Sequence, residues 1–173
     1  MKTLLNAKQI DLTIQRLAHQ IIEENPEVSD TVFIGIQPRG IFFSNRLVPV
    51  LEQLYGQPVK YGKLDITFYR DDVGRKLHIP NQTKIDFTID DTNVVIIDDV
   101  LYTGRTIRSA MDALIDFRRP AKVELCVLID RRFSRELPIQ PDFSGKAIDT
   151  IFSQKVNVKW GETDGVVEVV LEG

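Results

Sequence analysis

The 173-residue sequence predicts an α/β fold with a mainly parallel central sheet, helices on both faces of it and a small β-rich hood. Two observations carry this prediction. Short β-branched runs alternate with longer segments whose apolar residues have helical spacing, which is typical of a parallel sheet. The C-terminal third instead holds short apolar runs separated by Pro138 and Pro141, which indicates strands without crossover helices. We expect one domain over residues 1–173, because this length buries one sizeable core.

Four elements are predicted in the first half of the chain. They are a helix to about Asn25, a strand over residues 31–36, a helix from about Ile41 to Tyr55 and a strand over residues 59–69. Asn6 and Gln9 are spaced as a capping box at the start of the first helix. Pro49 lies inside the second helix, where a missing backbone donor predicts a kink or a late start.

The second half continues with strand, loop and helix. The predicted elements are a strand over residues 94–97, a helix opened by residues 103–106, a strand over residues 122–129 and short strands near 148–152, 156–160 and 166–171. The helix places four apolar side chains on one side: Ile107, Met111, Leu114 and Ile115. This repeated alternation indicates helices that cover both faces of the sheet.

Composition narrows the function classes. Apolar residues make up 43% of the chain and charged residues 27%, the balance of an ordinary globular protein. With a net charge of -3, nucleic-acid binding would need a local basic face. The one cysteine, Cys126, lies in an apolar run and is expected to be a reduced core residue. Neither a signal peptide nor an apolar run of about 20 residues is visible, so we expect a cytoplasmic protein without a membrane partner.

The most informative stretch joins the third predicted strand to the following helix. An apolar strand delivers Asp98 and Asp99 to the carboxyl edge of the sheet, where open α/β folds bind ligands. We expect both acids at the exposed end of this strand. Thr103, Gly104 and Thr106 then lie at the turn into the helix, where backbone N–H groups, two hydroxyls and the helix dipole attract an anion.

The two halves of this stretch suit different parts of one ligand. Carboxylates accept hydrogen bonds from sugar hydroxyls and hold Mg²⁺, whereas the turn binds phosphate. A ribose 5-phosphate satisfies both. The pattern Asp-Asp-x-x-x-Thr-Gly-x-Thr over residues 98–106 fixes five positions. It should occur by chance in about one in ten thousand chains of this length. A capped helix after a core strand is the simpler alternative, but a cap needs one polar residue and leaves the paired acids unexplained.

These residues resemble the phosphoribosyl pyrophosphate motif of the type I phosphoribosyltransferases. The form Asp-Asp-Val-Leu-Tyr-Thr-Gly-Arg-Thr is similar to that of the pyrimidine operon attenuation family, whose members are also uracil phosphoribosyltransferases. The resemblance extends to residues 65–72, 128–131 and 135–139 and to Gly145 with Lys146, so it covers nearly the whole chain. It implies that Asp98 and Asp99 hold the ribose hydroxyls and the cofactor Mg²⁺, directly or through water. The loop implied to wrap the 5-phosphate is Tyr102, Thr103, Gly104, Arg105 and Thr106.

Arg39 and Gly40 match the family's short pyrophosphate loop. Read from the residues alone, Arg39 is either a solvated loop charge or a pyrophosphate contact. We favour the contact, because Gly40 offers backbone N–H groups to the same anion. Pro38 stands where the family usually has threonine.

Two further groups are expected around the substrate. The resemblance places the grip on the base at Ile129, Asp130 and Arg131, which we expect just after the 122–129 strand at the same sheet edge as the acids. Arg70, Arg75 and Lys76 lie in a charged segment and are either surface residues or the cations of a lid over the substrate. Such lids exclude water from a charged reaction.

The implied reaction joins uracil to phosphoribosyl pyrophosphate and gives UMP and pyrophosphate. Displacement at C1 of the sugar passes through an oxocarbenium-like state, so no protein nucleophile is needed. We expect Asp98, Asp99 and Arg39 to act catalytically by managing charge. Solvent and Asp99 remain open as proton acceptors. The alternatives are a purine phosphoribosyltransferase for hypoxanthine or guanine and a non-catalytic nucleotide sensor that binds RNA.

The resemblance also implies an RNA-binding face, responsive to UMP, for the leader of a pyrimidine operon. The matching residues are Arg16, His19, Arg135 and Lys146. Gln15 and Gln140 stand where threonine and arginine are expected, and scattered surface charges are the alternative interpretation. We also expect a homodimer or a higher homo-oligomer, because symmetric dimers are the commonest assemblies.

Overall fold

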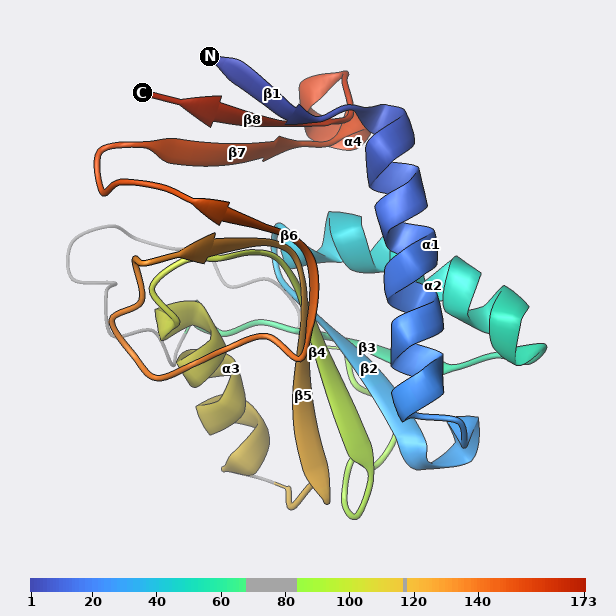
Figure 1. The fold of residues 1–173 in the computed structure, drawn as a ribbon. Helices are drawn as coiled ribbons and strands as arrows, with labels where there is room; N and C mark the ends of the chain where they lie inside the picture. The colour runs from blue at the N-terminus through green and yellow to red at the C-terminus, as the bar shows by residue number, and fades with distance from the viewer. Residues whose placement is uncertain (68–83, 117) are drawn as a thin grey trace.

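The computed structural model describes residues 1–67, 84–116 and 118–173. Its centre is a five-stranded parallel sheet with the strand order β3-β2-β4-β5-β6 (Figure 1). The strands are β2 (Thr31–Ile36), β3 (Lys60–Leu64), β4 (Asn93–Leu101), β5 (Lys122–Arg132) and β6 (Phe143–Asp149). The carboxyl ends of β2, β4 and β5 therefore meet at one edge.

Helices cover both faces of this sheet. Helices α1 (Ala7–Glu24) and α2 (Gly40–Tyr55) pack on one face, where Val95 and Ile97 of β4 join their core. Helix α3 (Arg105–Ile115) packs on the other face, against the alternate β4 side chains Val94 and Ile96. This burial on both faces explains why the central strands are continuous apolar runs. No helix in the described part of the chain could span a membrane.

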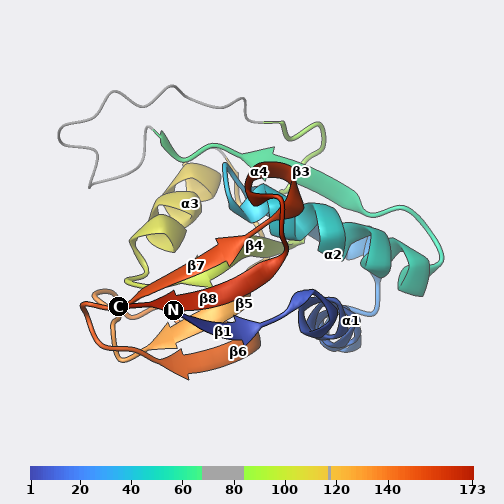
Figure 2. The same ribbon diagram turned by 90° about the horizontal axis from the view of Figure 1, so that it is seen from above.

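A second sheet of three antiparallel strands forms the hood (Figure 2). Its strands, in the order β1-β8-β7, are β1 (Lys2–Leu5), β8 (Glu168–Glu172) and β7 (Lys155–Lys159), with the short helix α4 (Gly161–Asp164) between β7 and β8. Trp160 at the start of α4 is fully buried and its ring stacks on Phe43 of α2, with ring centroids 6.4 Å apart. This aromatic contact ties the hood to the main domain.

The helical predictions are largely confirmed. The Asn6 and Gln9 capping box is present at the start of α1. Helix α2 begins at Gly40 and contains Pro49, so of the two expected effects of this proline, a kink or a late start, the late start does not occur. Ile115 is 60% exposed and does not join the apolar side of α3. It is the last residue of that helix, beyond the contact with the sheet.

Strand boundaries account for the other differences. Strand β3 ends at Leu64 and not near residue 69, whereas β4 and β5 run further than predicted and include the polar residues that follow their apolar runs. Strand β6 begins at Phe143 and extends the main sheet, which leaves Ile151 and Phe152 exposed beyond its end. Strand β1 was not predicted, because a four-residue strand that pairs with the far end of the chain has no local signal.

Candidate active site

The two adjacent acids lie inside strand β4. Asp98 is 7% exposed and Asp99 8% exposed, so the expectation of an exposed strand end is wrong. The strand continues through Val100 to Leu101 because β5 extends beside it in register. The Asp98 Oδ1 accepts a hydrogen bond from the Asp99 backbone N–H at 2.9 Å, and the Asp99 Oδ1 accepts one from the Val100 N–H at 2.8 Å. Backbone donors therefore orient both carboxylates.

The two acids have different surroundings. Burial raises the pKa of Asp99 above its ordinary value, and the nearby Arg39 guanidinium acts in the opposite direction. The Arg39 Nε lies 3.6 Å from the Asp99 Oδ2. Asp98 instead lies beside the start of α2, next to Gly40. Asp99 thus has the Arg39 cation near it. A second positive group would stabilise the charge of this buried carboxylate further.

The β2–α2 loop makes its close approach at Gly40. A Cβ at this position would lie 2.9 Å from the Asp98 Oδ1 and 2.9 Å from the Ile97 carbonyl oxygen. Only glycine therefore allows the start of α2 to reach strand β4. The Gln37–Pro38 peptide bond in this loop is cis. The loop brings Arg39 beside the paired acids.

The β4–α3 loop forms a second turn at the same edge. Gly104 has φ +94°, in the left-handed region that favours glycine, and it caps helix α3. The Thr103 Oγ1 accepts a hydrogen bond from the Arg105 N–H at 3.2 Å. A cavity of about 390 Å³ is lined by residues 100–107 and Glu136. The structure thus places the predicted phosphate loop around a cavity at the start of a helix.

Residues 135–139 hold this loop in place. The Thr103 carbonyl oxygen accepts hydrogen bonds from the N–H groups of Glu136 at 2.9 Å and Leu137 at 3.1 Å. Glu136 also pairs with the Arg105 Nε at 2.6 Å. The Arg135 Nη1 donates to the Tyr102 carbonyl oxygen at 2.7 Å. Sequence reasoning missed this supporting role, because the contacts join segments about 30 residues apart.

The predicted base residues lie within β5 and not beyond it. Ile129 is fully buried and pairs in register with Val100 of β4. Asp130 is 8% exposed and accepts a 2.7 Å hydrogen bond from the Arg135 Nη2. These residues adjoin the phosphate loop through the β4–β5 pairing.

Arg131 is 5% exposed, and its guanidinium carbon lies 3.9 Å from the centre of the Tyr102 ring. It donates from Nε to the Thr150 Oγ1 at 3.1 Å and from Nη2 to the Gln154 carbonyl oxygen. Burial lowers the pKa of Arg131. The Arg131 guanidinium is therefore held in a fixed position beside the Tyr102 ring.

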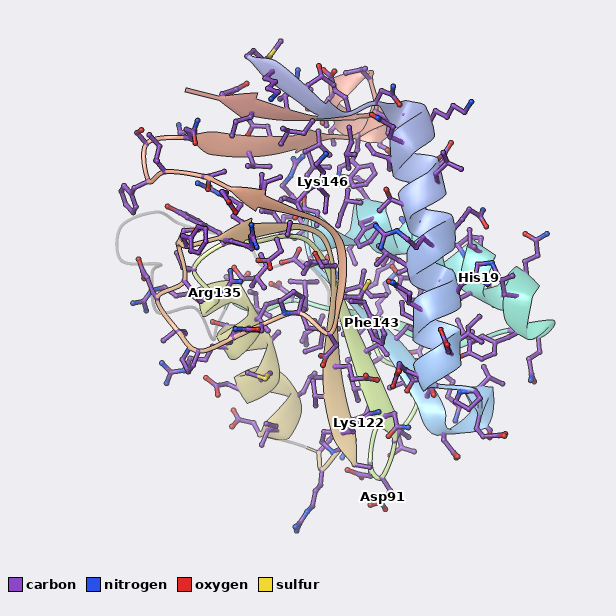
Figure 3. The ribbon with its side chains drawn as sticks, in the orientation of Figure 1. His19, Asp91, Lys122, Arg135, Phe143 and Lys146 are labelled. Atoms are coloured by element: carbon purple, nitrogen blue, oxygen red, sulfur yellow. The ribbon has the colours of Figure 1, made fainter. Side chains whose placement is uncertain are left out.

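The residues of the predicted RNA face have different environments (Figure 3). Arg16 on α1 donates to the Gly145 carbonyl oxygen of β6, while His19 and Lys146 are exposed. A Cβ at Gly145 would lie 2.7 Å from the Thr13 Cγ2, so glycine lets α1 approach β6 closely. Arg135 differs, because Asp130 and backbone carbonyl oxygens accept hydrogen bonds from its guanidinium. Arg70, Arg75 and Lys76, the predicted lid cations, lie outside the described residues.

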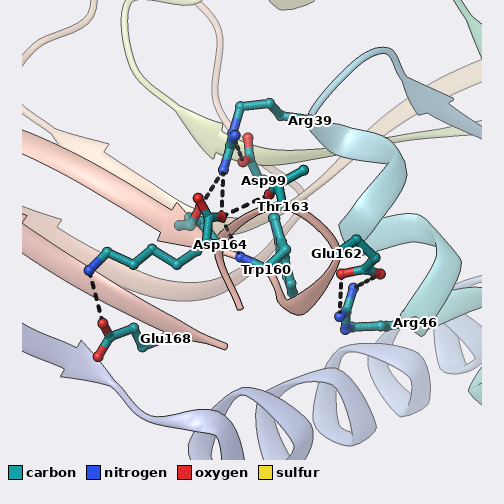
Figure 4. Close-up of polar contacts among 10 residues, drawn as sticks. Arg39, Arg46, Asp99, Trp160, Glu162, Thr163, Asp164 and Glu168 are labelled. Atoms are coloured by element: carbon teal, nitrogen blue, oxygen red, sulfur yellow. Dashed lines mark hydrogen bonds and ion pairs between the residues drawn. The ribbon is translucent and has the colours of Figure 1, made fainter. Parts of the chain in front are cut away.

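The hood contributes residues that the sequence did not mark. The Arg39 Nη2 donates to the Val158 carbonyl oxygen of β7 and lies 3.8 Å from the Asp164 Oδ2 of α4 (Figure 4). Further along α2, Arg46 makes a two-bond contact with Glu162, at 2.9 and 2.8 Å. The hood thus reaches the β2–α2 loop through Arg39. No local pattern could have revealed this, since Asp164 is an ordinary exposed acid at the end of the short helix α4.

Residues 1–163 match the model of the phosphoribosyl transferase domain family. The chain belongs to this family. Its curated relatives include proteins named "Bifunctional protein PyrR". The Limosilactobacillus fermentum protein is 44% identical over 98% of this chain and 96% of its own length, and the Deinococcus deserti protein is 46% identical over 98% and 93%. The family predicted from the motif residues is therefore confirmed.

Solved structures confirm the fold. A Trypanosoma cruzi hypoxanthine phosphoribosyltransferase superposes with a TM-score of 0.73 at 20% identity, covering 98% of this chain and 90% of that chain. A Bacillus anthracis hypoxanthine-guanine phosphoribosyltransferase gives a TM-score of 0.72 at 18% identity, covering 98% and 96%. The parallel sheet with a small antiparallel hood is thus an arrangement that this phosphoribosyltransferase shares with them.

Proposed function

We propose that this phosphoribosyltransferase joins uracil to phosphoribosyl pyrophosphate, releasing UMP and pyrophosphate. The observation that carries the proposal is the meeting of paired acids, a phosphate-type turn and an arginine loop at the carboxyl ends of β2 and β4. The base preference rests on the relatives: the proteins named PyrR are 44–46% identical, whereas the hypoxanthine enzymes are 18–20% identical. The sequence motif of this chain also resembles that of the pyrimidine operon attenuation family, whose members use uracil.

The proposed roles follow from position. The loop that ends at Gly104 holds the 5-phosphate with backbone N–H groups, and Asp98 and Asp99 accept hydrogen bonds from the ribose hydroxyls. Arg39 stabilises the negative charge of the departing pyrophosphate. As C1 of the sugar gains positive charge, the buried acids stabilise it more than they stabilise the ground state. Tight positioning of the sugar supplies the remainder of the rate increase.

The cofactor proposed for this site is Mg²⁺. The described residues contain no group of three or more His, Cys, Asp or Glu side chains that could hold a metal without help. Two carboxylates suit Mg²⁺, which in phosphate chemistry takes one or two protein oxygens and completes its shell with substrate oxygens and water. Asp98 and Asp99 would hold the ion, which would neutralise pyrophosphate charge when bound.

Base preference is tested by supplying uracil, hypoxanthine and guanine in turn, each with phosphoribosyl pyrophosphate and Mg²⁺. Formation of UMP at a rate far above that of any purine nucleotide is expected. Faster reaction with a purine would overturn the uracil assignment and leave the phosphoribosyltransferase intact.

The phosphate site is tested separately by melting temperature. An excess of phosphoribosyl pyrophosphate at 100 times Kd stabilises a folded protein by about 2.7 kcal/mol. Thr106→Val should weaken this response, because it removes a hydroxyl from the phosphate loop. An unchanged Tm in the wild-type protein would contradict the site.

A second proposed role is RNA binding that responds to UMP. It is supported by the approach of α1 to β6, which gathers Arg16, His19 and Lys146 onto neighbouring elements. Binding to the leader RNA of the pyrimidine operon is measured at several salt concentrations, with and without UMP. Lys146→Ala should remove one phosphate contact and flatten the slope of log affinity against log salt by about one unit. Affinity equal to that for an unrelated hairpin would refute this role.

The proposed assembly is a homodimer or a larger homo-oligomer. Light scattering at micromolar concentration tests it. A mass of about one chain, 19.8 kDa, would refute it.

A further inference from the structure

Arg39 is held from two sides. Strand β4 supplies Asp99, whose Oδ2 is 3.6 Å from the Arg39 Nε, and the hood supplies the Val158 carbonyl oxygen and the Asp164 carboxylate, both at Nη2. The Arg39 side chain is nevertheless 48% exposed, so part of the guanidinium still faces solvent. An incoming anion can therefore reach this cation without breaking its contacts with the hood.

Asp164 is itself fixed in place. Its Oδ2 accepts hydrogen bonds from the Trp160 N–H at 2.8 Å and from the Thr163 Oγ1 at 2.9 Å (Figure 4). These hydrogen bonds lower the pKa of Asp164, and the one from the Trp160 N–H has the larger effect. The carboxylate is therefore kept ionised. Trp160 is fully buried against Phe43. The carboxylate therefore stands on a rigid part of the hood.

The other partner of Arg39 has a competing task. Under the proposed function Asp99 must accept hydrogen bonds from the ribose hydroxyls and bind Mg²⁺. The hydroxyls and the ion both compete with Arg39 for the carboxylate oxygen atoms of Asp99. An arginine held by Asp99 alone would lose its partner as the substrate arrives. The contacts with the hood do not involve the substrate groups, so they can hold Arg39 throughout the reaction.

We propose that Asp164 is a positioning residue, which with the Val158 carbonyl oxygen holds the Arg39 guanidinium toward the pyrophosphate of the substrate. This inference rests on the proposed function of the β2–α2 loop and extends it to the hood. Nothing in the site requires Asp164 to touch the substrate. Its effect reaches the reaction only through Arg39.

The test compares Asp164→Asn with the matched control Glu162→Gln. Both remove one acid of α4 that pairs with an arginine, but Glu162 contacts Arg46 of α2 and not Arg39 of the β2–α2 loop. Asp164→Asn should raise the KM for phosphoribosyl pyrophosphate and the inhibition constant of inorganic pyrophosphate by about three- to fivefold, which is near the upper end of the contribution of a partly exposed charge pair. The Kd for UMP, which lacks a pyrophosphate, should stay within about twofold. Glu162→Gln should leave all three unchanged.

A double-mutant cycle with Arg39→Ala gives the deciding result. If Asp164 acts through Arg39, its substitution should have little further effect once Arg39 is alanine. Additive effects, or equal effects of Asp164→Asn and Glu162→Gln, would overturn the positioning role. Unchanged pyrophosphate affinity in Arg39→Ala alone would instead contradict the proposed function of the loop. Partial recovery in Asp164→Glu would further support the role of the carboxylate.

Discussion

The two loops that enter helices at the carboxyl edge of the sheet are built differently. The β4–α3 loop carries its turn in its own residues, above all in Gly104 with its left-handed backbone, and residues 135–139 support it from behind. The β2–α2 loop is placed by residues elsewhere in the chain: Asp98 and the Ile97 carbonyl oxygen leave no room for a side chain at Gly40, and Arg39 is held by the hood. One loop is therefore visible in a short motif, and the other depends on packing.

The acids between the two loops give the largest expected effect. Asp98→Asn and Asp99→Asn should each lower turnover by at least about a hundredfold, because each removes a charge that stabilises the transition state. Both asparagines can still accept the backbone hydrogen bonds that orient the present side chains. Circular dichroism and Tm serve as controls for the fold. Turnover within a few-fold of wild type would contradict the proposed catalytic role of the two acids.

Substituting each loop glycine sharpens the comparison. Gly40→Ala forces a Cβ against strand β4 and should cost about 1–3 kcal/mol of stability, as overpacking does. Gly104→Ala strains a φ of +94° and should cost about 1–2 kcal/mol. Because 1 kcal/mol shifts Tm by about 2–4 °C at this size, thermal melts measure both effects.

The two variants should also differ in their ligand response. Gly104→Ala should weaken the stabilisation by phosphoribosyl pyrophosphate, whereas Gly40→Ala should in addition disturb Asp98 and reduce turnover. If Gly40→Ala were as stable and active as wild type, the close packing of α2 on β4 would be wrong.

The support behind the phosphate loop is tested with two arginines. Arg135→Ala should cost about 1–3 kcal/mol, because it leaves the buried Asp130 carboxylate without its partner. Arg132→Ala removes a pair of equal length, 2.7 Å, but this pair is exposed and should be worth less than about 1 kcal/mol. Urea unfolding compares them. Equal costs would mean that residues 135–139 do not stabilise the loop.

The smallest expected effect is in the pH dependence of stability. Burial raises the pKa of Asp99 above 3.8, its value in the unfolded chain, so the folded state binds the proton more tightly. Asp99 therefore makes the protein less stable as pH rises from 3.8 through the folded pKa. Asp99→Asn removes this loss, and its Tm relative to wild type should increase from pH 4 to pH 7. A difference that falls with pH would mean that Arg39 outweighs burial.

The elements and the phosphate loop could be predicted from the sequence because their signals are local. The capping box of α1 and the buried central strands follow from short patterns, and residues 103–106 carry the chemistry of an anion-binding turn. Strand ends were less predictable. The extension of β4 through Asp98 and Asp99 depends on pairing with β5, which no β4 residue encodes.

The sequence by itself determined the α/β class, the family and the chemistry of one loop, since periodicity and motif spacing are properties of neighbouring residues. Tertiary structure decided the burial of the paired acids, the inward binding of Arg135 and the attachment of Arg39 to Val158 and Asp164. Each of these joins residues that are distant in the chain. Their contacts exist only after the sheet forms and the hood packs on α2, so their physical cause lies in packing.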